Sequence, residues 1–445
     1  MKNKLAHCSF CGIDATPETP LIGGANGYIC ETCARLAYQV VTNWERKRTM
    51  TDEVEESLAT PAAIKARLDE YVIGQGLAKE ILAVAVYNHY KRLYHDQSPI
   101  DIEQSEEENN NNNNDNDDVE INKSNILMLG PSGTGKTLLA STLAKIVGVP
   151  FIIADATTLT QAGYVGDDVE NILERLVKAA DGNVRLAEWG IIYIDEIDKI
   201  SRTSESAMVD RDVSGEGVQQ ALLKLVEGTT LQLEIPGEKN QVETVTIDSQ
   251  NILFIAGGAF VDLEKQVAKR VDPKPSKIGF NALVENKDET QISAEQLLQE
   301  TQPEDLRRFG LIPEFIGRFP IIATLEHLDE AALVEILTKP RNALVRQYQK
   351  LFSYENVELE FTPKALTAIA AKALKHKTGA RGLRSIQEQL LRKCMFNIPS
   401  RKNVIRCIVD EKAVNGNGEI QLIEKTETEK TEKTEKTEKK EANAG

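Results

Sequence analysis

A phosphate-binding loop is predicted by a run of glycine, hydroxyl and lysine residues: Gly130, Pro131, Ser132, Gly133, Thr134, Gly135, Lys136 and Thr137. An apolar run at 125–129 precedes the loop and predicts a buried strand, and a helical pattern begins at Leu138. In this context the backbone N–H groups and the helix N-terminus bind phosphates, Lys136 reaches the β- and γ-phosphate oxygens, and Thr137 ligates Mg²⁺. A chance glycine-rich turn is the alternative, but it explains neither flank. Residues 130–138 are therefore predicted to bind a nucleoside triphosphate.

Two carboxylates end a second apolar run, from Trp189 to Ile194, and predict further groups of the same site. Asp195 would hold Mg²⁺ through water, and Glu196 would polarise the attacking water. Asp198 is an alternative base, but it lies two residues further along the chain, beyond the end of the predicted strand. We therefore assign the catalytic carboxylate to Glu196.

Four cysteines near the N-terminus have the spacing of a structural zinc site, Cys8-x₂-Cys11 and Cys30-x₂-Cys33. Each pair presents two thiolates to one tetrahedral ion, and a segment of about 40 residues needs such a staple because its hydrophobic core is small. Two disulfides are the alternative, which a cytoplasmic location disfavours. Four protein ligands leave no open position, so the ion would be structural rather than catalytic.

Further apolar runs at 151–154, 251–256 and 321–324 alternate with helical stretches. Together with the two runs above they predict an α/β fold with a five-stranded, doubly wound parallel sheet. Residues 329–352 and 363–396 are expected to be helical, with a lone β-rich segment near 404–409, which predicts a smaller α-rich domain. The predicted domains are a Cys₄ zinc-binding domain (1–48), a linker (49–66), a large ATPase domain (67–320), a small domain (321–424) and a tail (425–445).

The 445-residue chain has a net charge of −16, which is unevenly distributed. Residues 101–120 contain nine acidic and no basic side chains, so the remainder carries about −7. This acidic insert, with its asparagine run, and the Thr-Glu-Lys repeats of the tail are predicted to be disordered spacers. The absence of a signal peptide, a transit peptide and a bilayer-spanning apolar run favours a cytoplasmic protein that binds no membrane. The acidic charge argues against nucleic acid as a partner.

The order of these motifs, followed by Pro313 to Arg318 and by Gly379 to Arg381, resembles that of the AAA+ ATPases and, more narrowly, of the ClpX family. The resemblance runs from Cys8 to about Ile423 and covers nearly the whole chain outside the acidic insert and the tail. Members of this family are ring-shaped, ATP-driven protein unfoldases that supply a separate ClpP peptidase. The resemblance implies a homo-hexamer with ATP, Mg²⁺ and Zn²⁺ as cofactors.

The resemblance also implies roles around the nucleotide. Val72 and Ile73 look like the apolar wall that packs on adenine. Arg318 resembles the arginine finger that reaches the γ-phosphate in a neighbouring subunit, and Arg381 resembles the sensor 2 arginine of the small domain. A planar guanidinium at either place would stabilise the charge of the transferred phosphoryl group. One position departs from the wider AAA+ pattern, because Ala256-Gly257-Gly258 ends its strand without a polar sensor 1 residue.

An aromatic residue stands between glycines in Gly163-Tyr164-Val165-Gly166, where glycine provides less rigidity than a packed core requires. The residues alone are equally compatible with a channel-lining loop and with a hydrophobic plug at a subunit seam. In ClpX-like motors the matching loop lines the axial channel, which implies that Tyr164 and Val165 grip unfolded or tagged substrate proteins. Arg211 to Gly217 resemble the second pore loop.

A docking peg is suggested by two apolar side chains around a glycine, Ile278, Gly279 and Phe280, in a long insert after the fourth predicted strand. The resemblance implies that this tripeptide binds a ClpP-like peptidase.

The predicted channel entrance departs from the family. ClpX proteins often carry an Arg-Lys-His loop that captures acidic or carboxylate-ended tags, whereas this chain has Glu238, Lys239 and Asn240. A less positive entrance is expected to bind such tags more weakly than a variant with the basic trio restored.

Three functions are compatible with these motifs to different degrees. The favoured hypothesis is an ATP-dependent unfoldase that threads proteins through a ring and feeds them to the peptidase, with adaptors docking at the zinc domain. No Ser-His-Asp arrangement suggests itself among the five histidines, so peptide cleavage is expected from a partner. A remodelling chaperone without a peptidase is the second hypothesis. A nucleic-acid motor, prompted by the zinc motif beside the phosphate-binding loop, is the third.

Overall fold

The computed structural model describes residues 7–16, 19–23, 27–37, 59–96, 121–160, 167–168, 170–201, 215–236, 242–271, 293–376, 378–401 and 403–425. Several predicted segments lie outside the described residues, namely Tyr164 and Val165, residues 211–214, Glu238 to Asn240, Ile278 to Phe280, the acidic insert and residues 426–445 of the tail. The chain divides into two compact units, one formed by residues 1–59 with 90–118 and the other by residues 60–89 with 119–445.

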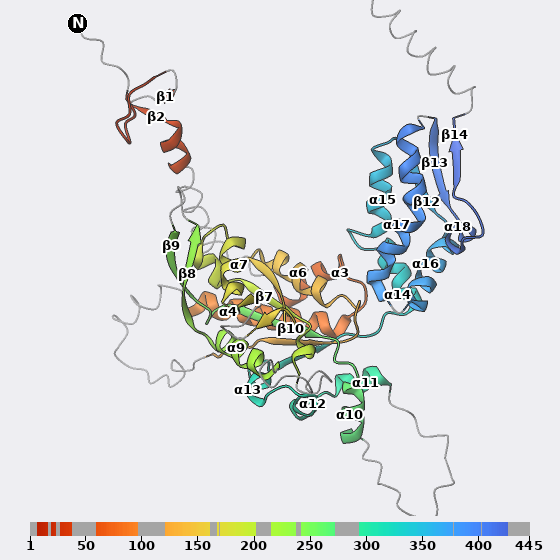
Figure 1. Ribbon diagram of the computed structural model, residues 1–445, viewed down its shortest axis with the longest axis horizontal. Coiled ribbons are helices and arrows are strands. Elements are labelled where there is room, and N and C mark those ends of the chain that lie inside the picture. Colours follow the sequence, from red (N-terminus) through yellow and green to blue (C-terminus); the bar gives the residue numbers. More distant parts are fainter. Residues whose placement is uncertain are drawn as a thin grey trace, which may run out of the picture. The chain divides into compact units, whose positions relative to one another are not determined.

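A five-stranded parallel sheet lies at the centre of the second unit (Figure 1). Its strands are β3 (Ile126–Leu129), β4 (Phe151–Asp155), β7 (Ile191–Asp195), β10 (Leu253–Gly258) and β11 (Ile321–Thr324), in the order β11-β3-β10-β7-β4. The three inner strands β3, β10 and β7 are covered on both faces, which explains why each reads as a continuous apolar run, whereas Ile153 of the edge strand β4 is exposed. The predicted parallel sheet is confirmed. β11 carries it beyond residue 320, where the sequence placed the end of the large domain.

Helices pack against this sheet. α6 (Lys136–Val147) contacts β7 and β10, and α7 (Asn171–Ala179) contacts β4. Ile192 and Ile194 belong to the core that includes α7, so Tyr193 and Asp195 at the alternating positions face the other side of the sheet. The other helices of this region are α3 (Pro61–Asp69), α4 (Gly76–Asp96), α8 (Val184–Glu188), η1 (Ile197–Ile200), α9 (Gly215–Glu227), α10 (Leu263–Val271), α11 (Ala294–Gln299), α12 (Pro303–Phe309) and α13 (Pro313–Gly317).

Two smaller sheets accompany the central one. β8 (Thr230–Pro236) and β9 (Val242–Asp248) form an antiparallel hairpin, and β5 (Leu159–Thr160) pairs with β6 (Asp167–Asp168). Apolar and polar residues alternate in the hairpin, and Leu233 and Ile247 are buried, as expected for strands with one face on the core. The predicted channel-entrance residues lie in the chain between β8 and β9.

The C-terminal part combines helices with a three-stranded sheet (Figure 1). The elements are α14 (Glu330–Thr338), α15 (Leu344–Ser353), β12 (Glu358–Phe361), α16 (Pro363–Lys375), α17 (Gly379–Asn397), η4 (Ile398–Ser400), β13 (Val404–Val409), α18 (Glu411–Asn415) and β14 (Gln421–Glu424). The expectation of a lone strand is wrong, because β13 pairs with both β12 and β14. The helical stretch expected over 363–396 is divided in two, with Gly379 at a φ of +54° where α17 begins.

The N-terminal module is small. β1 (Leu21–Gly23) and β2 (Tyr28–Cys30) form an antiparallel pair, and residues 31–37 are helical. Phe10, Ile22 and Leu36 are largely exposed, so few apolar side chains are left to form a core among the described residues of this module.

Candidate functional site

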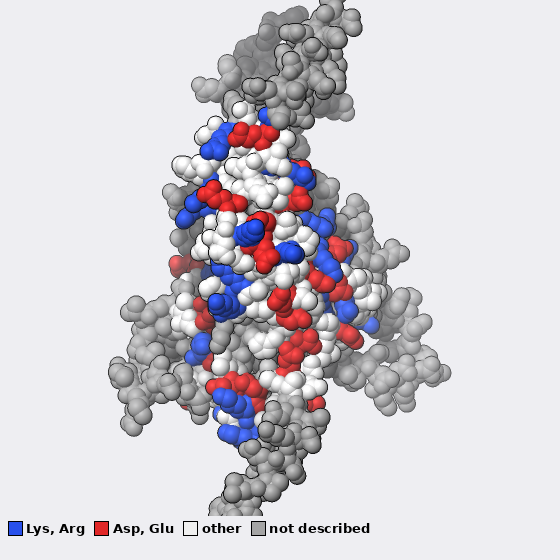
Figure 2. Space-filling model, turned by 90° about the vertical axis from the view of Figure 1, so that its right-hand side faces the viewer, with Lys and Arg blue, Asp and Glu red and all other residues white. Residues whose placement is uncertain are grey.

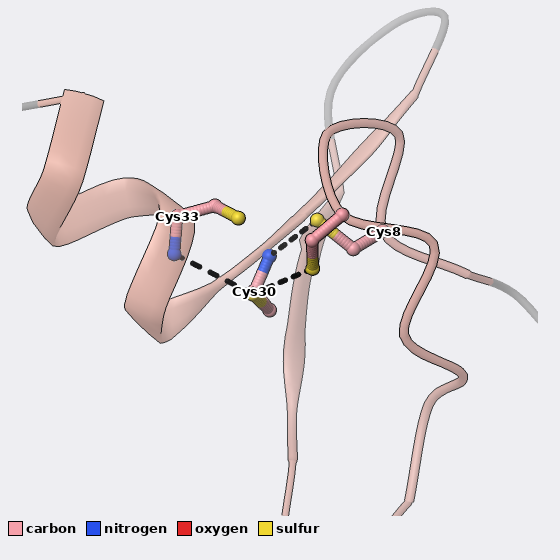
Figure 3. Close-up of side chains that lie close together, drawn as sticks. Cys8, Cys30 and Cys33 are labelled. Atoms are coloured by element: carbon pink, nitrogen blue, oxygen red, sulfur yellow. Dashed lines mark hydrogen bonds between the residues drawn. The ribbon is translucent and has the colours of Figure 1, made fainter.

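The four N-terminal cysteines converge. Their sulfur atoms all lie within 4.8 Å of one another, and Cys8, Cys30 and Cys33 approach each other from a loop, the end of β2 and the following helix (Figure 3). The Cys11 and Cys30 sulfurs are 3.6 Å apart, close to the edge of about 3.8 Å that a tetrahedron with four Zn–S bonds requires. A disulfide bond would bring two sulfurs to about 2 Å, and all four cysteines are free. The donor set therefore fits Zn²⁺.

Backbone N–H groups donate to these sulfurs and favour the thiolate form that binds a metal cation. The Cys30 N–H points at the Cys8 sulfur (3.4 Å) and the Cys33 N–H at the Cys30 sulfur (3.5 Å). Burial raises the pKa of Cys8, but backbone hydrogen bonds from Cys11 and Cys30 outweigh it and bring the pKa to about 6. Hydrogen bonding with Cys11 and Cys30 raises the pKa of Cys33 to about 12. Metal binding must therefore displace protons from this cluster.

The predicted phosphate-binding loop joins β3 to α6. Gly133 and Gly135 adopt φ angles of +82° and +100°, which glycine reaches without steric cost. α6 begins at Lys136 without a side-chain cap, so its first N–H groups are available to a phosphate. The predicted strand, loop and helix are all present in the predicted order.

Lys136 is held inside the loop. Only 8% of the residue is exposed, and its Nζ donates to the carbonyl oxygens of Gly130 (2.6 Å) and Pro131 (3.0 Å). Burial lowers the pKa of Lys136, while the carboxylates of Asp195 and Asp198 act in the opposite direction. A buried ammonium group bound mainly by neutral carbonyls favours an anionic ligand. A triphosphate would supply that charge.

Thr137 and Asp195 meet where β7 ends. Thr137 Oγ1 donates to Asp195 Oδ2 (3.2 Å), and the N–H of Glu196 donates to Asp195 Oδ1 (3.0 Å). A hydroxyl and a carboxylate are the oxygen ligands that Mg²⁺ prefers. These two side chains therefore fit a magnesium ion, which would neutralise phosphate charge when bound.

The two candidate bases are placed differently. Glu196 is exposed and has a φ of +56°, a left-handed conformation that costs a non-glycine residue about 1–2 kcal/mol. Such strain at the end of a strand is typical of a functional position. Asp198 is 6% exposed, and its Oδ1 accepts a hydrogen bond from the Ala259 N–H (3.1 Å). The geometry therefore favours Glu196 as the carboxylate that can reach a water molecule.

Val72 and Ile73 lie on a segment that is anchored on both sides. Val72 is buried and Ile73 is partly buried, and Lys79 Nζ donates to the Val72 carbonyl oxygen (2.6 Å). Gln75 donates to the Glu326 carbonyl oxygen (2.9 Å) and accepts from the Glu326 N–H (2.8 Å). Glu326 lies just after β11, so the predicted adenine wall is tied to the chain that leaves the central sheet.

Arg381 lies on the first turn of α17, which contacts the phosphate-binding loop. The Ala380 N–H donates to the Gly133 carbonyl oxygen (3.3 Å). A Cβ at Gly133 would lie 2.9 Å from the Thr378 carbonyl oxygen. Burial lowers the pKa of Lys136 most, and the charge of Arg381 lowers it further, so Arg381 lies close enough to the loop to act on its lysine.

Arg318 lies at the opposite edge of the sheet. Its carbonyl oxygen accepts a hydrogen bond from Asn125 Nδ2 (2.8 Å) at the start of β3, whereas the loop follows the end of β3. The five residues 125–129, which are Asn125 and the four residues of β3, span about 16 Å, farther than the Arg318 side chain extends. The Arg318 side chain is 54% exposed and pairs with Glu227 through Nε (3.0 Å) and Nη2 (2.8 Å). Arg318 therefore does not reach the loop of its own subunit.

Comparison with known proteins decides the family. The ClpX C4-type zinc finger matches residues 6–43, the AAA domain (Cdc48 subfamily) matches 121–322, and the C-terminal, D2-small domain of ClpB protein matches 328–407. The "ATP-dependent Clp protease ATP-binding subunit ClpX 3" of Methylococcus capsulatus (strain ATCC 33009 / NCIMB 11132 / Bath) is 59% identical over 428 residues, 95% of this chain and 96% of that protein. The "ATP-dependent Clp protease ATP-binding subunit ClpX" of Azotobacter vinelandii is 53% identical over 91% of this chain and 88% of that protein. The chain belongs to the ClpX family.

ClpX membership agrees with the chemistry of the two sites. The chain is an AAA+ ATPase that uses ATP and Mg²⁺, and its N-terminal Cys₄ centre binds Zn²⁺. Among the described residues, no helix is both long enough and apolar enough to span a bilayer.

Loss of zinc is expected to unfold the N-terminal module alone. Cys11→Ser should lower zinc content from one ion per chain to nearly none and raise amide hydrogen exchange in residues 7–37, because metal binding supplies the folding free energy of such modules. Metal analysis and exchange mass spectrometry measure both quantities. Cys394→Ser removes a thiol outside the cluster and is the control. Full zinc content in Cys11→Ser would contradict the Cys₄ assignment.

Several contacts of the predicted site residues and their neighbours were not identified from the sequence. Tyr193 donates to Asp195 Oδ1 (3.2 Å), Gln75 fixes Glu326, and Glu227 pairs with Arg318. The tyrosine lies on β7 two residues before Asp195, a spacing that could have indicated that both share one face. The partners of Gln75 and Arg318 are 251 and 91 residues distant in sequence, so no local pattern signals them.

Proposed function

We propose that this ClpX-family ATPase is a protein unfoldase and translocase. It would recognise tagged or unfolded proteins, unfold them through the axial pore of a homo-hexamer and feed them to a ClpP-like peptidase, while also remodelling proteins without the peptidase. The observation that carries this proposal is the sequence identity of 59% and 53%, over more than nine-tenths of this chain, to proteins named as ATP-binding subunits of the ATP-dependent Clp protease. A cytoplasmic location and adaptor docking at the zinc domain belong to the same proposal.

The proposed catalytic unit spans two subunits. Lys136 and Arg381 would bind the triphosphate, Thr137 and Asp195 would hold its magnesium ion, and Glu196 would orient the attacking water. Arg318 lies a strand's length from its own phosphate-binding loop. This separation supports a role for Arg318 at the nucleotide of a neighbouring subunit, where a guanidinium would stabilise developing charge.

Movement of the small domain would couple ATP hydrolysis to the pulling of a substrate protein. α17 carries Arg381 and contacts the phosphate-binding loop through Ala380. Gln75 holds both backbone polar groups of Glu326 on the connection between β11 and α14. A change of charge at the nucleotide would act on the small domain at α17 and at the connection before α14, and Tyr164 and Val165 would transmit the motion to substrate.

The proposed peptidase-docking segment has a firmly anchored base. Arg270, near the end of α10, donates through Nε to Asp305 Oδ1 (3.2 Å) and Oδ2 (3.0 Å), and it also bonds to the Glu300 carbonyl oxygen. Asp305 is fully buried, where a carboxylate requires a partner. Residues 272–292 lie in the chain between α10 and α11, and the ion pair ties α10 to α12. This ion pair supports Ile278, Gly279 and Phe280 as a docking element on a fixed platform.

Charge on one face of the molecule does not favour nucleic acid. Figure 2 shows lysine and arginine intermingled with aspartate and glutamate over the face in view, rather than gathered into one basic area. A protein that binds polyanions by counterion release needs such an area.

Degradation of a stably folded tagged protein with a purified ClpP-like peptidase tests the proposed function. Deleting 278–280 should abolish degradation but leave ATP-dependent unfolding, because the motor is intact and the docking element is missing. Tyr164→Ala should retain ATP hydrolysis and lose unfolding, whereas Tyr164→Phe keeps the ring and should retain both. Degradation that survives the deletion would refute the docking assignment. Unfolding that survives Tyr164→Ala would refute the gripping role.

A further inference from the structure

Tyr193 is a buried residue of the nucleotide site that has no assigned role. It is fully buried on β7, and its hydroxyl donates to Asp195 Oδ1 at 3.2 Å. Residues two apart on a strand share a face, so the ring runs alongside Asp195 toward the carboxyl end of the sheet. A phenol is protonated at neutral pH, and a carboxylate oxygen can only accept, so the Tyr193 hydroxyl is the donor of this hydrogen bond.

Gly257 provides the space that this hydroxyl occupies. Tyr193 pairs in register with Ile255 of β10, which places Gly257 two residues further on the same face. A Cβ at Gly257 would overlap the Tyr193 hydroxyl and would lie 2.8 Å from the Cζ atom of the ring. The strand end that lacks a polar side chain is therefore filled by the phenol of the neighbouring strand.

The Asp195 carboxylate accepts three hydrogen bonds from three different donors. Thr137 Oγ1 binds Oδ2, while the Glu196 N–H and the Tyr193 hydroxyl bind Oδ1. The tyrosine and the Glu196 N–H hold one oxygen, so the carboxylate plane is fixed and the other oxygen is directed at Thr137. Hydrogen bonds to a charged acceptor are about twice as strong as neutral ones, and second partners of this kind orient metal ligands.

We propose that Tyr193 is a positioning residue that orients Asp195 for Mg²⁺. Gly257 is required because only a residue without a side chain leaves room for the Tyr193 hydroxyl. The inference rests on the assignment of Asp195 as the magnesium-binding carboxylate. Tyr193 acts through Asp195 and touches neither the nucleotide nor the attacking water in this role.

Magnesium titration of ATPase activity tests the proposal in the full-length chain. Tyr193→Phe keeps the ring and should raise the Mg²⁺ concentration for half-maximal hydrolysis by about tenfold, the effect expected for one hydrogen bond to a charged group. Binding of ATP in EDTA and the thermal unfolding midpoint should not change. Gly257→Ala should reproduce the magnesium effect, because its methyl group displaces the hydroxyl. Tyr90→Phe, which removes the hydroxyl of another fully buried tyrosine, is the matched control.

A double-mutant cycle distinguishes a failure of the proposed role of Tyr193 from a failure of the assignment of Asp195 as the magnesium-binding carboxylate. In an Asp195→Asn background, the magnesium effect of Tyr193→Phe should disappear, because the positioned carboxylate is gone. The proposal would be overturned if Tyr193→Phe left the magnesium dependence unchanged. It would also be overturned if Tyr193→Phe weakened ATP binding in EDTA and lowered the thermal unfolding midpoint as strongly as it changed the magnesium dependence. An unchanged magnesium dependence in Asp195→Asn itself would instead overturn the role of Asp195.

Discussion

Replacing Glu196 by glutamine is expected to lower the ATP hydrolysis rate by about a thousandfold, within the range found for general bases, while ATP still binds. The amide cannot polarise water, but it keeps the size of the side chain and the hydrogen bond from the Glu196 N–H to Asp195 (3.0 Å). Steady-state phosphate release measures the rate, and equilibrium binding of labelled ATP measures occupancy.

Asp198→Asn is the discriminating comparison for this result. Asp198 is buried and bound by the Ala259 N–H, and the asparagine carbonyl oxygen can still accept that bond. Its effect on hydrolysis should therefore be much smaller than that of Glu196→Gln. A larger loss in Asp198→Asn would transfer the catalytic role to Asp198 and contradict our preference.

Replacing Arg318 by alanine is expected to reduce hydrolysis by about a thousandfold or more, the effect of losing an arginine finger. Arg318→Lys should restore little, because an ammonium lacks the planar fork that spans phosphoryl oxygens. Nucleotide binding to a single subunit should persist, because Arg318 lies at the other end of β3 from its own loop. ATPase rates and ATP affinity measured on the same preparations check both statements.

Glu227→Gln controls for the ion pair that Arg318 makes within its own subunit. Both side chains are substantially exposed, at 54% and 41%, and exposed pairs contribute little to stability. The variant should therefore fold normally and keep hydrolysing ATP. Equal losses in Glu227→Gln and Arg318→Ala would mean that the pair itself, rather than the guanidinium, is what hydrolysis requires.

The sequence predicted the central sheet well because its signal is local. β3 and β10 are buried throughout, and β7 is buried up to Asp195, so the apolar runs reveal them without knowledge of their neighbours. β12 was missed because its four residues alternate, with Leu359 and Phe361 inward and Glu358 and Glu360 outward. β14 is short and mostly exposed, so neither composition nor periodicity marks it.

The nucleotide site was predictable where motif spacing encodes the chemistry. The contact between Thr137 and Asp195 follows from a loop and a strand end that both lie at the carboxyl edge of a parallel sheet. The contacts that hold these site residues in place were not predictable, because they depend on the order of the strands in the sheet. Tyr193 reaches Gly257 only because β7 and β10 are neighbours in the sheet, and sequence periodicity carries no information on strand order.

Mixing two inactive variants tests most directly whether each catalytic site is shared between neighbouring subunits. A subunit with Arg318→Ala keeps Glu196, and a subunit with Glu196→Gln keeps Arg318, so mixed rings contain interfaces with both groups intact. Equimolar mixing after subunit exchange is predicted to restore hydrolysis to about one quarter of the wild-type rate, the share of such interfaces in a randomly assembled closed ring. A mixture that hydrolyses ATP no faster than the separate variants would contradict the account.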